Sequence, residues 1–412
     1  MRIGIYFAAN KASGGVFEYS LTILEAFSRI KNNDYFIFST SRDIPAKFRS
    51  LRNFHFINLF SKSREKALVV RDTISDFVAK YFPIFFKILY KLGIFELFKL
   101  LIKLSNRNII SIIKSKHLDL IFYPTTSNLS FVINVPSIVS IHDLHHRLTP
   151  WFKEASAGGR WELREYTYLN VVKNAYRLLV ESNVGKENLL RFYEIKNDQV
   201  VVLPMVPPSY ITSKITRKEI YKLLRVKGIQ REFLYYPAKF WPHKNHLRIV
   251  KALHLLKQKG ILLDLVLSGS KNADFSTFDE VMNLSSRLGI SRQIKYLGFV
   301  DVRTLSTLYK GSLALVMPTF FGATNLPVLE AWKVGTAVIY SDICGCRDQL
   351  GNAGLLVNPK SYRDIAGKIE EVYNNRELRR ELIKRGTKRS RQWTEKEFVN
   401  KVVDLIKGYK AA

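Results

Sequence analysis

The sequence predicts an α/β protein of two domains, each built on a parallel β-sheet with crossover helices. Its 412 residues are enough for two or three domains with sizeable cores. Hydrophobic residues make up 47% and charged residues 24%, the composition of an ordinary globular protein rather than a disordered or fibrous one. Short apolar runs rich in β-branched residues alternate with helical stretches over most of the chain, which is typical of parallel sheets.

Two sets of strands are expected, separated by the prolines at 203–208. The first set lies at residues 2–8, 34–39, 54–59, 118–123, 136–141, 177–181 and 199–203. The second set lies at residues 232–237, 263–268, 293–297, 313–317, 336–340 and 355–357. Because each set opens afresh with a strand, we expect two Rossmann-like domains that face one another. Their expected boundaries are 1–205 and 206–392, and residues 393–412 are expected to form a helix that packs back on the first domain.

The net charge of the chain is strongly positive. There are 65 Lys and Arg against 35 Asp and Glu, which gives +30. Residues 1–200 carry 29 basic and 17 acidic residues, so the charge is not confined to a tail. Such a surface attracts nucleic acid, an acidic membrane face or phosphorylated substrates. No zinc knuckle, RNA-binding aromatic run or helix-turn-helix accompanies the charge, so nucleic acid is not an expected partner.

The two cysteines and the N-terminus point to the cytoplasm. Cys344 and Cys346 are too close in sequence for an easy bridge, which favours a reducing compartment, and they lack two further soft ligands for a metal. The first eight residues turn polar too quickly for a signal peptide and are expected to form a buried strand.

Residues 80–116 approach the apolar content of a membrane helix but carry charges throughout. At about 100° per residue the charges fall on one side, at Lys87, Lys91, Glu96, Lys99 and Lys103. The other side holds Phe86, Leu89, Tyr90, Ile94, Leu97, Leu100 and Leu101. One interpretation is a core helix with a solvated Lys face, and the other is a helix lying in a membrane interface. The high apolar content, with 12 basic and 4 acidic groups in residues 61–116, favours an anionic membrane surface.

Several catalytic motifs are missing, which excludes whole classes of enzyme. There is no Gly-x-x-x-x-Gly-Lys-Ser/Thr loop, no Gly-x-Gly-x-x-Gly and no His-Glu-x-x-His. There is also no Asp-x-Asp, which argues against a metal-bridged nucleotide-sugar site. We therefore expect no metal and no bound cofactor.

Two segments of the first domain are candidates for ligand binding. Gly14 and Gly15 follow the first strand and precede a helical pattern, where free N–H groups could meet an anion, although a tight turn explains them equally well. His142 and Asp143 lie at the carboxyl end of a strand, where open α/β sheets place their ligands. With His145 and His146 nearby, the alternatives are a zinc site, ordinary loop histidines, or one functional histidine, His142, ordered by Asp143. We favour the last.

In the second domain, the stretch 236–246 follows the first strand and precedes a helix. It contains two lysines, Lys239 and Lys244, with two histidines and Asn245, a set that suits a diphosphate. A solvated basic loop is the alternative, but Phe240 and Trp241 would be unusual there.

The stretch 318–335 also links a strand to a helix, with Pro327 in the first turn of that helix. Glu330 lies one turn further along. Its carboxylate could therefore reach a ribose diol while the amides of the loop face phosphate.

Together these two stretches resemble the donor site of the retaining GT-B glycosyltransferases of family GT4. In the Gly-Arg…Lys-Asn element of that family the arginine position falls on Lys239, and Lys244 matches outright. The Glu-x7-Glu motif maps onto residues 322–330, so Glu330 matches the ribose-binding glutamate, and Gly322 replaces the first. The resemblance implies that Thr324 or Asn325 takes over the missing contact to the donor sugar, with Leu326 beside them.

The resemblance extends over most of the chain. His142 maps onto the family histidine near the reacting carbon, and Gly14 and Gly15 match its N-terminal glycine loop. Gly298-Phe299 and the run 341–359 also resemble the family.

The resemblance implies a GT-B fold and retaining transfer of a sugar from a nucleotide diphosphate sugar without a metal. The expected acceptor is a glycan or polyprenyl-linked glycan in surface polysaccharide assembly, on the inner face of the cytoplasmic membrane. Because the first glutamate is missing, a non-catalytic protein that binds nucleotide or glycan stays open as the alternative. No residue pattern specifies the donor base, the sugar, the linkage or the oligomeric state.

Overall fold

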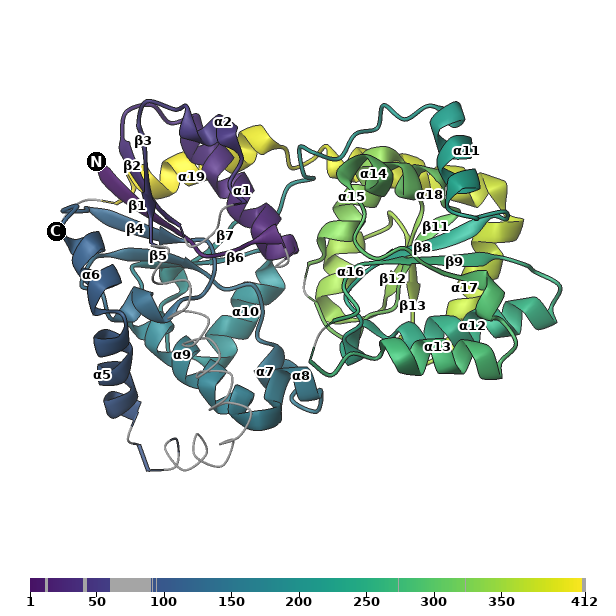
Figure 1. Cartoon of the computed structure of the whole chain (residues 1–412), viewed down its shortest axis with the longest axis horizontal. Helices are drawn as coiled ribbons and strands as arrows, with labels where there is room; N and C mark the ends of the chain where they lie inside the picture. Colours follow the sequence, from purple (N-terminus) through teal and green to yellow (C-terminus); the bar gives the residue numbers. More distant parts are fainter. Residues whose placement is uncertain are drawn as a thin grey trace. The chain divides into compact units, whose positions relative to one another are not determined.

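The computed structural model describes residues 1–11, 14–39, 43–59, 90, 92–93, 95–272, 274–322 and 324–409. The chain forms two compact units. Unit 1 comprises Met1–Trp151, Ala155–Met205 and Glu395–Ala412, and unit 2 comprises Phe152–Glu154 and Val206–Thr394. In each unit a central sheet is covered by helices (Figure 1).

Unit 1 is built on a seven-stranded parallel sheet with the order β3-β2-β1-β4-β5-β6-β7. Its strands are β1 (Arg2–Phe7), β2 (Asp34–Ser39), β3 (Phe54–Asn58), β4 (Leu120–Tyr123), β5 (Ser137–Ser140), β6 (Arg177–Val180) and β7 (Val200–Val202). The central strands β4 and β5 are buried along their whole length, as expected for a sheet covered on both faces. Because β5 and β6 are neighbours, the residues that follow them share one edge of the sheet.

The helices of unit 1 follow the strands as crossovers. They are α1 (Gly15–Ser28), α2 (Ala46–Arg49), α5 (Phe95–Ser105), α6 (Arg107–Lys114), α7 (His145–Leu148), α9 (Arg160–Asn174), α10 (Asn183–Phe192) and α19 (Glu395–Lys407). The short helix α8 (Lys153–Ser156) begins in the piece of chain that belongs to unit 2 and ends in unit 1.

The C-terminal helix α19 returns to the first unit, as the sequence predicts. Arg29 at the end of α1 forms an ion pair of 2.6 Å with Glu395. Phe398 is fully buried and packs edge-on against the ring of Tyr19. These contacts hold the last helix against α1.

Unit 2 is built on a six-stranded parallel sheet with the order β10-β9-β8-β11-β12-β13. Its strands are β8 (Phe233–Pro237), β9 (Asp264–Ser268), β10 (Ile294–Tyr296), β11 (Ala314–Met317), β12 (Val338–Ser341) and β13 (Leu355–Val357). Its helices are α11 (Arg217–Val226), α12 (His246–Gln258), α13 (Phe278–Arg287), α14 (Val302–Gly311), α15 (Leu326–Val334), α16 (Cys344–Leu350), α17 (Tyr362–Asn374) and α18 (Arg376–Ser390).

The strands agree with the sequence prediction to within two residues at every boundary, and the fold class is confirmed. Short apolar runs bounded by polar turns are local signals, so they are visible before the chain folds. Cys344 and Cys346 belong to the first turn of α16.

The single helix expected over 80–116 is wrong in the part that the structure describes. There α5 ends at Ser105 and α6 begins at Arg107, with Asn106 between them in a non-helical conformation. Residues 80–89, which include Phe86, Lys87 and Leu89, lie outside the described residues, as do Lys91 and Ile94. Across the described ranges, no helix combines the length and the apolar content needed to cross a membrane.

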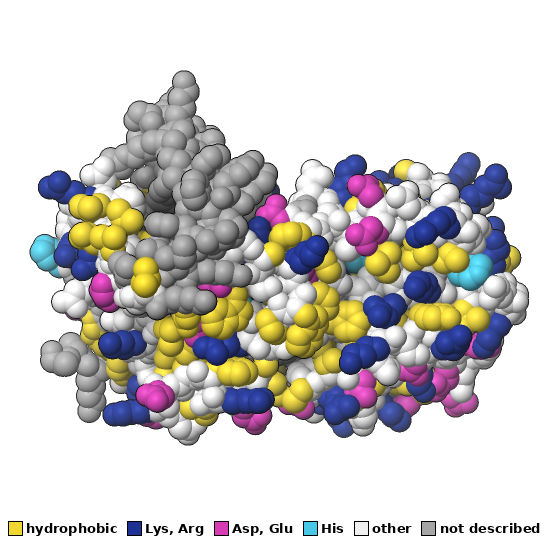
Figure 2. Space-filling model, turned by 90° about the horizontal axis from the view of Figure 1, so that it is seen from below, with side chains coloured by type: hydrophobic (Ala, Val, Ile, Leu, Met, Phe, Trp, Pro, Cys, Tyr) yellow, Lys and Arg dark blue, Asp and Glu magenta, His cyan; other side chains and the backbone are white. Residues whose placement is uncertain are grey.

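The apolar side of α5 is divided between the interior and the surface. Ile102 is buried, and Phe98 packs edge-on against Tyr166. Four leucines a turn apart remain about half exposed: Leu97, Leu100, Leu101 and Leu104. We call these four side chains the leucine face. Hydrophobic side chains also lie among Lys and Arg over the surface seen in Figure 2.

Candidate functional site

The two stretches that the sequence assigns to a donor site lie together at the carboxyl edge of the sheet of unit 2. Strands β8 and β11 are neighbours, so the loops that follow them meet. The backbone N–H of Phe320 donates to the carbonyl of His243 at 2.8 Å, and the hydroxyl of Thr319 donates to the same oxygen at 3.1 Å. This is the edge at which open α/β sheets bind ligands.

Asn245 joins the loops at this edge. Its side-chain amide is buried and donates to the carbonyls of Pro318 at 2.7 Å and Pro359 at 2.8 Å. Its φ of 62° is a left-handed conformation that asparagine tolerates better than most residues, and α12 starts immediately after it. Asn245 therefore fixes the shape of the site.

The two lysines lie on the segment between β8 and α12. The Lys239 ammonium is 5.1 Å from the centre of the Trp241 ring, and burial lowers the pKa of Lys239. The backbone of Lys244 is held at both ends, because its N–H donates to Trp241 at 2.9 Å and its carbonyl accepts from the Tyr236 hydroxyl at 3.0 Å.

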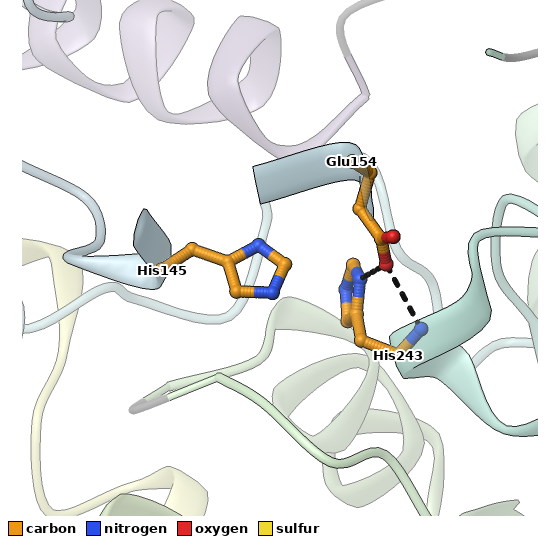
Figure 3. A group of neighbouring side chains, drawn as sticks. All are labelled: His145, Glu154 and His243. Carbon is orange, nitrogen blue, oxygen red and sulfur yellow. Dashed lines mark hydrogen bonds and ion pairs between the residues drawn. The ribbon is translucent and has the colours of Figure 1, made fainter. Parts of the chain in front are cut away.

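The two histidines of this segment are both held by neighbouring groups of the protein. His246 is stacked between Tyr236 and Phe240, and burial lowers its pKa to about 3, so it is uncharged at neutral pH. The ring of His243 hydrogen-bonds through Nδ1 to Glu154 at 2.8 Å, and its backbone N–H donates to the same carboxylate at 3.0 Å (Figure 3). Burial between two aromatic rings keeps His246 uncharged. The carboxylate of Glu154, which lies far away in the sequence, orients the ring of His243.

The loop before α15 is closely packed around Gly322. The φ of Gly322 is +135°, and a Cβ atom there would lie 2.5 Å from Nδ2 of Asn325. Asn325 donates from its amide to the Tyr340 hydroxyl, while its backbone N–H donates to Gln349 at 2.9 Å. The thiol of Cys346 donates to the Gly322 carbonyl at 3.3 Å. A glutamate at position 322 does not fit this arrangement.

The remaining predicted residues of this loop follow Gly322 closely. Thr324 is half-buried, and Leu326 is the first residue of α15, also half-buried.

Glu330 is buried between two tyrosines. Its Oε1 accepts a hydrogen bond of 2.7 Å from Tyr210, and its Oε2 accepts one of 2.6 Å from Tyr309. Burial raises the pKa of Glu330, although both hydrogen bonds act against that shift. The effect of burial on the pKa dominates because the donors on both oxygens are neutral hydroxyls and not cations.

In unit 1 the glycine pair opens α1, as the sequence predicts. Gly14 has a φ of +61° and precedes the first residue of α1, Gly15, and a Cβ atom at either position would meet nothing within 4 Å. One turn later, Tyr19 packs edge-on against the His142 ring, with their centres 5.0 Å apart. The start of α1 and His142 therefore belong to the same edge of the sheet.

The carboxylate that orders His142 is Glu181, and the expected pairing with Asp143 is wrong. His142 Nδ1 is 2.6 Å from Glu181, and its Nε2 is 2.9 Å from the carbonyl of Pro124. Burial lowers the pKa of His142, but the hydrogen bonds and the charge of Glu181 more than offset it and raise that pKa overall. Since both partners are acceptors, two N–H donors satisfy them together, which is the imidazolium form.

Asp143 has different partners. It forms an ion pair with Arg164 and accepts a hydrogen bond of 2.9 Å from the backbone N–H of His145. Burial acts to raise the pKa of Asp143, but Arg164 and the hydrogen bond outweigh it and lower the pKa to about 2. Asp143 thus shapes the turn after β5 and holds an arginine beside it.

Sequence reasoning missed the partners of the predicted residues. Glu181 could have been found, because it directly follows β6 at the edge where ligands bind. Tyr210 and Glu154 carry no such signal, since each reaches its partner from an irregular or short segment far away in sequence.

Residues 223–389, nearly all of unit 2, match the family described as glycosyl transferases group 1. Residues 223–389 therefore form a group 1 glycosyltransferase (GT4) domain. The matched region contains Lys239, Lys244, Gly322 and Glu330, the residues on which the sequence resemblance rests.

Curated relatives of the chain are distant. O-antigen chain mannosyltransferase B of Escherichia coli is 22% identical over 275 residues, which cover 66% of this chain and 70% of the relative. O-antigen chain mannosyltransferase RfbU of Salmonella typhimurium is 25% identical over 204 residues, covering 49% of this chain and 53% of the relative. The match to RfbU thus spans about half of that protein.

Solved structures share the whole fold. A glycosyltransferase from Rickettsia africae superposes with a TM-score of 0.69 at 18% identity, covering 99% of this chain and 98% of the other. Anabaena HepE in complex with UDP-glucose also has a TM-score of 0.69, at 15% identity, covering 99% of this chain and all of HepE. The fold of the chain is therefore GT-B.

Proposed function

We propose that this protein is a retaining hexosyltransferase that takes its sugar from a nucleotide diphosphate sugar without a metal ion. Unit 2 would bind the donor and unit 1 the acceptor. The O-antigen mannosyltransferases among its relatives, and the UDP-glucose bound by HepE, make GDP-mannose and UDP-sugars the first donors to test. The acceptor would be a glycan or a polyprenyl-linked glycan of a surface polysaccharide.

The meeting of the two loops of unit 2 carries this proposal. It brings the segment with Lys239 and Lys244 next to the segment that leads to Glu330. Two ammonium groups beside the start of α12 suit the charge of a departing diphosphate, the role that a divalent cation has in other sugar transferases. Glu330 would bind the ribose, and Thr324, Asn325 and Leu326 would line the sugar pocket.

In unit 1, we propose that His142 acts as a fixed cation near the reacting sugar. With both ring nitrogens already directed at acceptors, it is poorly placed to remove a proton as a general base. Asp143 would act indirectly, by holding Arg164 at the same edge. The glycine pair at the start of α1 leaves room for a ligand to approach the backbone.

The acceptor proposal rests on the surface of unit 1. The leucine face leaves four aliphatic side chains half exposed on a helix that also carries Lys99 and Lys103. Aliphatic residues with flanking lysines suit the interface of an anionic bilayer. We therefore propose that the protein works in the cytoplasm, bound peripherally to the inner face of the membrane, where a lipid-linked glycan would be presented.

Calorimetric binding of UDP, GDP and dTDP to the purified protein tests the donor site. Each titration is run in EDTA and again with Mg²⁺, on the natural protein and on Lys244→Ala. Lys251→Ala is the matched control, because Lys251 is an exposed lysine on α12. We expect one nucleotide to bind equally well in both buffers and to lose at least tenfold in affinity in Lys244→Ala only.

Three other outcomes of the titrations would contradict different parts of the proposal. Binding that requires Mg²⁺ would contradict the metal-independent mechanism. Binding without any transfer or hydrolysis of the matching nucleotide sugar would favour the non-catalytic alternative. If none of the three nucleotides binds, the donor-site proposal fails.

A further inference from the structure

Both oxygens of the Glu330 carboxylate already accept a hydrogen bond in the structure. Each of its oxygens accepts one tyrosine hydroxyl, at 2.7 Å from Tyr210 and 2.6 Å from Tyr309, and only 5% of the residue is exposed. A ribose diol would offer two hydroxyl groups in the same manner, one to each oxygen. The two tyrosines thus supply the kind of hydrogen bonds that a nucleoside would supply.

Tyr309 cannot give way to a ligand. It is fully buried in α14, and its ring packs edge-on against Tyr235 with their centres 5.0 Å apart. Its backbone carbonyl also accepts the hydroxyl of Thr336 at 2.7 Å. Moving this ring would open a cavity in the core, which is costly. Tyr309 therefore fixes the position of Oε2 whether or not a ligand is bound.

Tyr210 lies in a different setting. It is only half-buried and belongs to the stretch between β7 and α11, which has no regular secondary structure around it. Its neighbour Pro208 is tied to α15 through its carbonyl, which accepts from the Lys333 ammonium at 2.5 Å. The segment is thus anchored beside Glu330, while the Tyr210 side chain is only partly covered.

We propose that Tyr210 is an internal substitute for the ribose, which leaves Glu330 when the nucleotide binds, whereas Tyr309 is a positioning residue that keeps the carboxylate oriented throughout. The substitute hydroxyl prevents Oε1 of the buried carboxylate from being left without a donor in the nucleotide-free protein, which would be costly. Nucleotide binding then exchanges one hydrogen bond for another. This inference rests on the proposed role of Glu330 in binding ribose.

The proposal predicts opposite effects for two conservative variants. Tyr210→Phe removes a competitor, so the affinity for UDP or GDP should rise by roughly three- to tenfold, the worth of one hydrogen bond. The KM for the nucleotide sugar should fall with little change in kcat. Tyr309→Phe leaves Oε2 without its fixed donor, so the same affinity should fall. The exposed Tyr221 of α11 provides the control variant Tyr221→Phe, which should change neither value.

The 2′-deoxy nucleotides test whether the effect acts through the ribose. The gain in Tyr210→Phe should be larger for UDP than for dUDP, or for GDP than for dGDP, because the missing hydroxyl is one of those that compete with Tyr210. Equal gains for both would mean a general loosening of the segment and would overturn the proposal. A loss of affinity in Tyr210→Phe would overturn it as well.

The variant Glu330→Gln distinguishes a failure of the substitute role of Tyr210 from a failure of the proposed ribose-binding function of Glu330. If Glu330→Gln binds UDP and dUDP as the natural protein does, Glu330 is not the ribose ligand, and both proposals fall. If Glu330→Gln loses the preference for ribose but Tyr210→Phe gains nothing, only the substitute role of Tyr210 is wrong.

Discussion

His142 in unit 1 and Glu330 in unit 2 are both buried ionisable groups at the carboxyl edge of a parallel sheet, yet their surroundings differ in kind. His142 lies against the carboxylate of Glu181 and the carbonyl of Pro124. Glu330 lies against two neutral hydroxyls, those of Tyr210 and Tyr309. The first has a partner of opposite charge, and the second does not.

The pKa of both groups is raised, but the shift has opposite meanings. For His142 a raised pKa means that the charged form is favoured, because Glu181 offsets the burial. For Glu330 a raised pKa means that the neutral form is favoured, because hydroxyl groups offset the burial only in part. Unit 1 therefore holds a stabilised charge, whereas unit 2 holds a carboxyl group whose charged form is disfavoured by burial.

The largest effect is expected from adding a second carboxylate to unit 2. Gly322→Glu would restore the first glutamate of the family motif, but the φ of +135° and the contact with Asn325 leave no place for a side chain. We expect turnover to fall at least tenfold and the free energy of unfolding to fall by about 1–3 kcal/mol. Transfer assays and urea denaturation measure the two effects.

Gly322→Ala is the control, because it carries the strain without the charge. It should lose a similar part of the stability. Unchanged or higher turnover in Gly322→Glu would show that the loop accommodates the family glutamate after all.

Removing the charge of Glu181, the partner of His142 in unit 1, should have the next largest effect. The size of this effect should depend on pH. In Glu181→Gln the hydrogen bond to His142 loses its charge, which we expect to cost about 1–3 kcal/mol of unfolding free energy. Because the pKa of His142 is raised above 6.5, the stabilisation is complete below about pH 6.5 and is lost as the pH rises through the higher folded-state value. Urea denaturation at pH 6 and pH 9 should therefore show the larger difference at pH 6. A difference that is larger at pH 9 would contradict the imidazolium assignment.

Glu330→Gln, the corresponding change in unit 2, should alter the free energy of unfolding less than Glu181→Gln does, and in the opposite direction. Because the pKa of Glu330 is raised above 4.5, its contribution to stability is greatest below that pH and declines as the pH rises through the folded-state value. Glutamine does not titrate, so Glu330→Gln should gain on the natural protein between pH 4.5 and neutral pH. We expect the two to differ by no more than about 1 kcal/mol at pH 7. A large loss of stability at pH 7 would mean that the carboxylate is held charged, as in unit 1.

The smallest effect is expected from replacing exposed leucines on the surfaces of the two units. Replacing Leu97 and Leu101 of the leucine face with serine should reduce sedimentation with anionic liposomes by several-fold, because half-exposed side chains gain only a part of the about 1.5–3 kcal/mol that burying a whole leucine contributes. Leu262→Ser is the matched control, since Leu262 is exposed to a similar degree in unit 2. Equal sedimentation of all three proteins would remove the leucine face from the proposed membrane contact.

The sequence by itself determined the order of strands and helices, the family resemblance and the positions of most candidate residues. Apolar runs, turn residues and the Lys-Asn and Leu-Pro-x-x-Glu segments are local patterns, which can be read directly from the sequence. The loop containing Lys244 and the loop that leads to the helix containing Glu330 do meet in the structure.

Only the tertiary structure decided the charge and the orientation of each candidate side chain. Glu181 reaches His142 across 39 residues, and Tyr210 reaches Glu330 across 120. His246 is stacked between two rings instead of exposed, and the apolar side of α5 is divided between the interior and the surface. The charge and orientation of a side chain depend on burial and on partners brought together by the packing of distant segments, and no local pattern in the sequence encodes them.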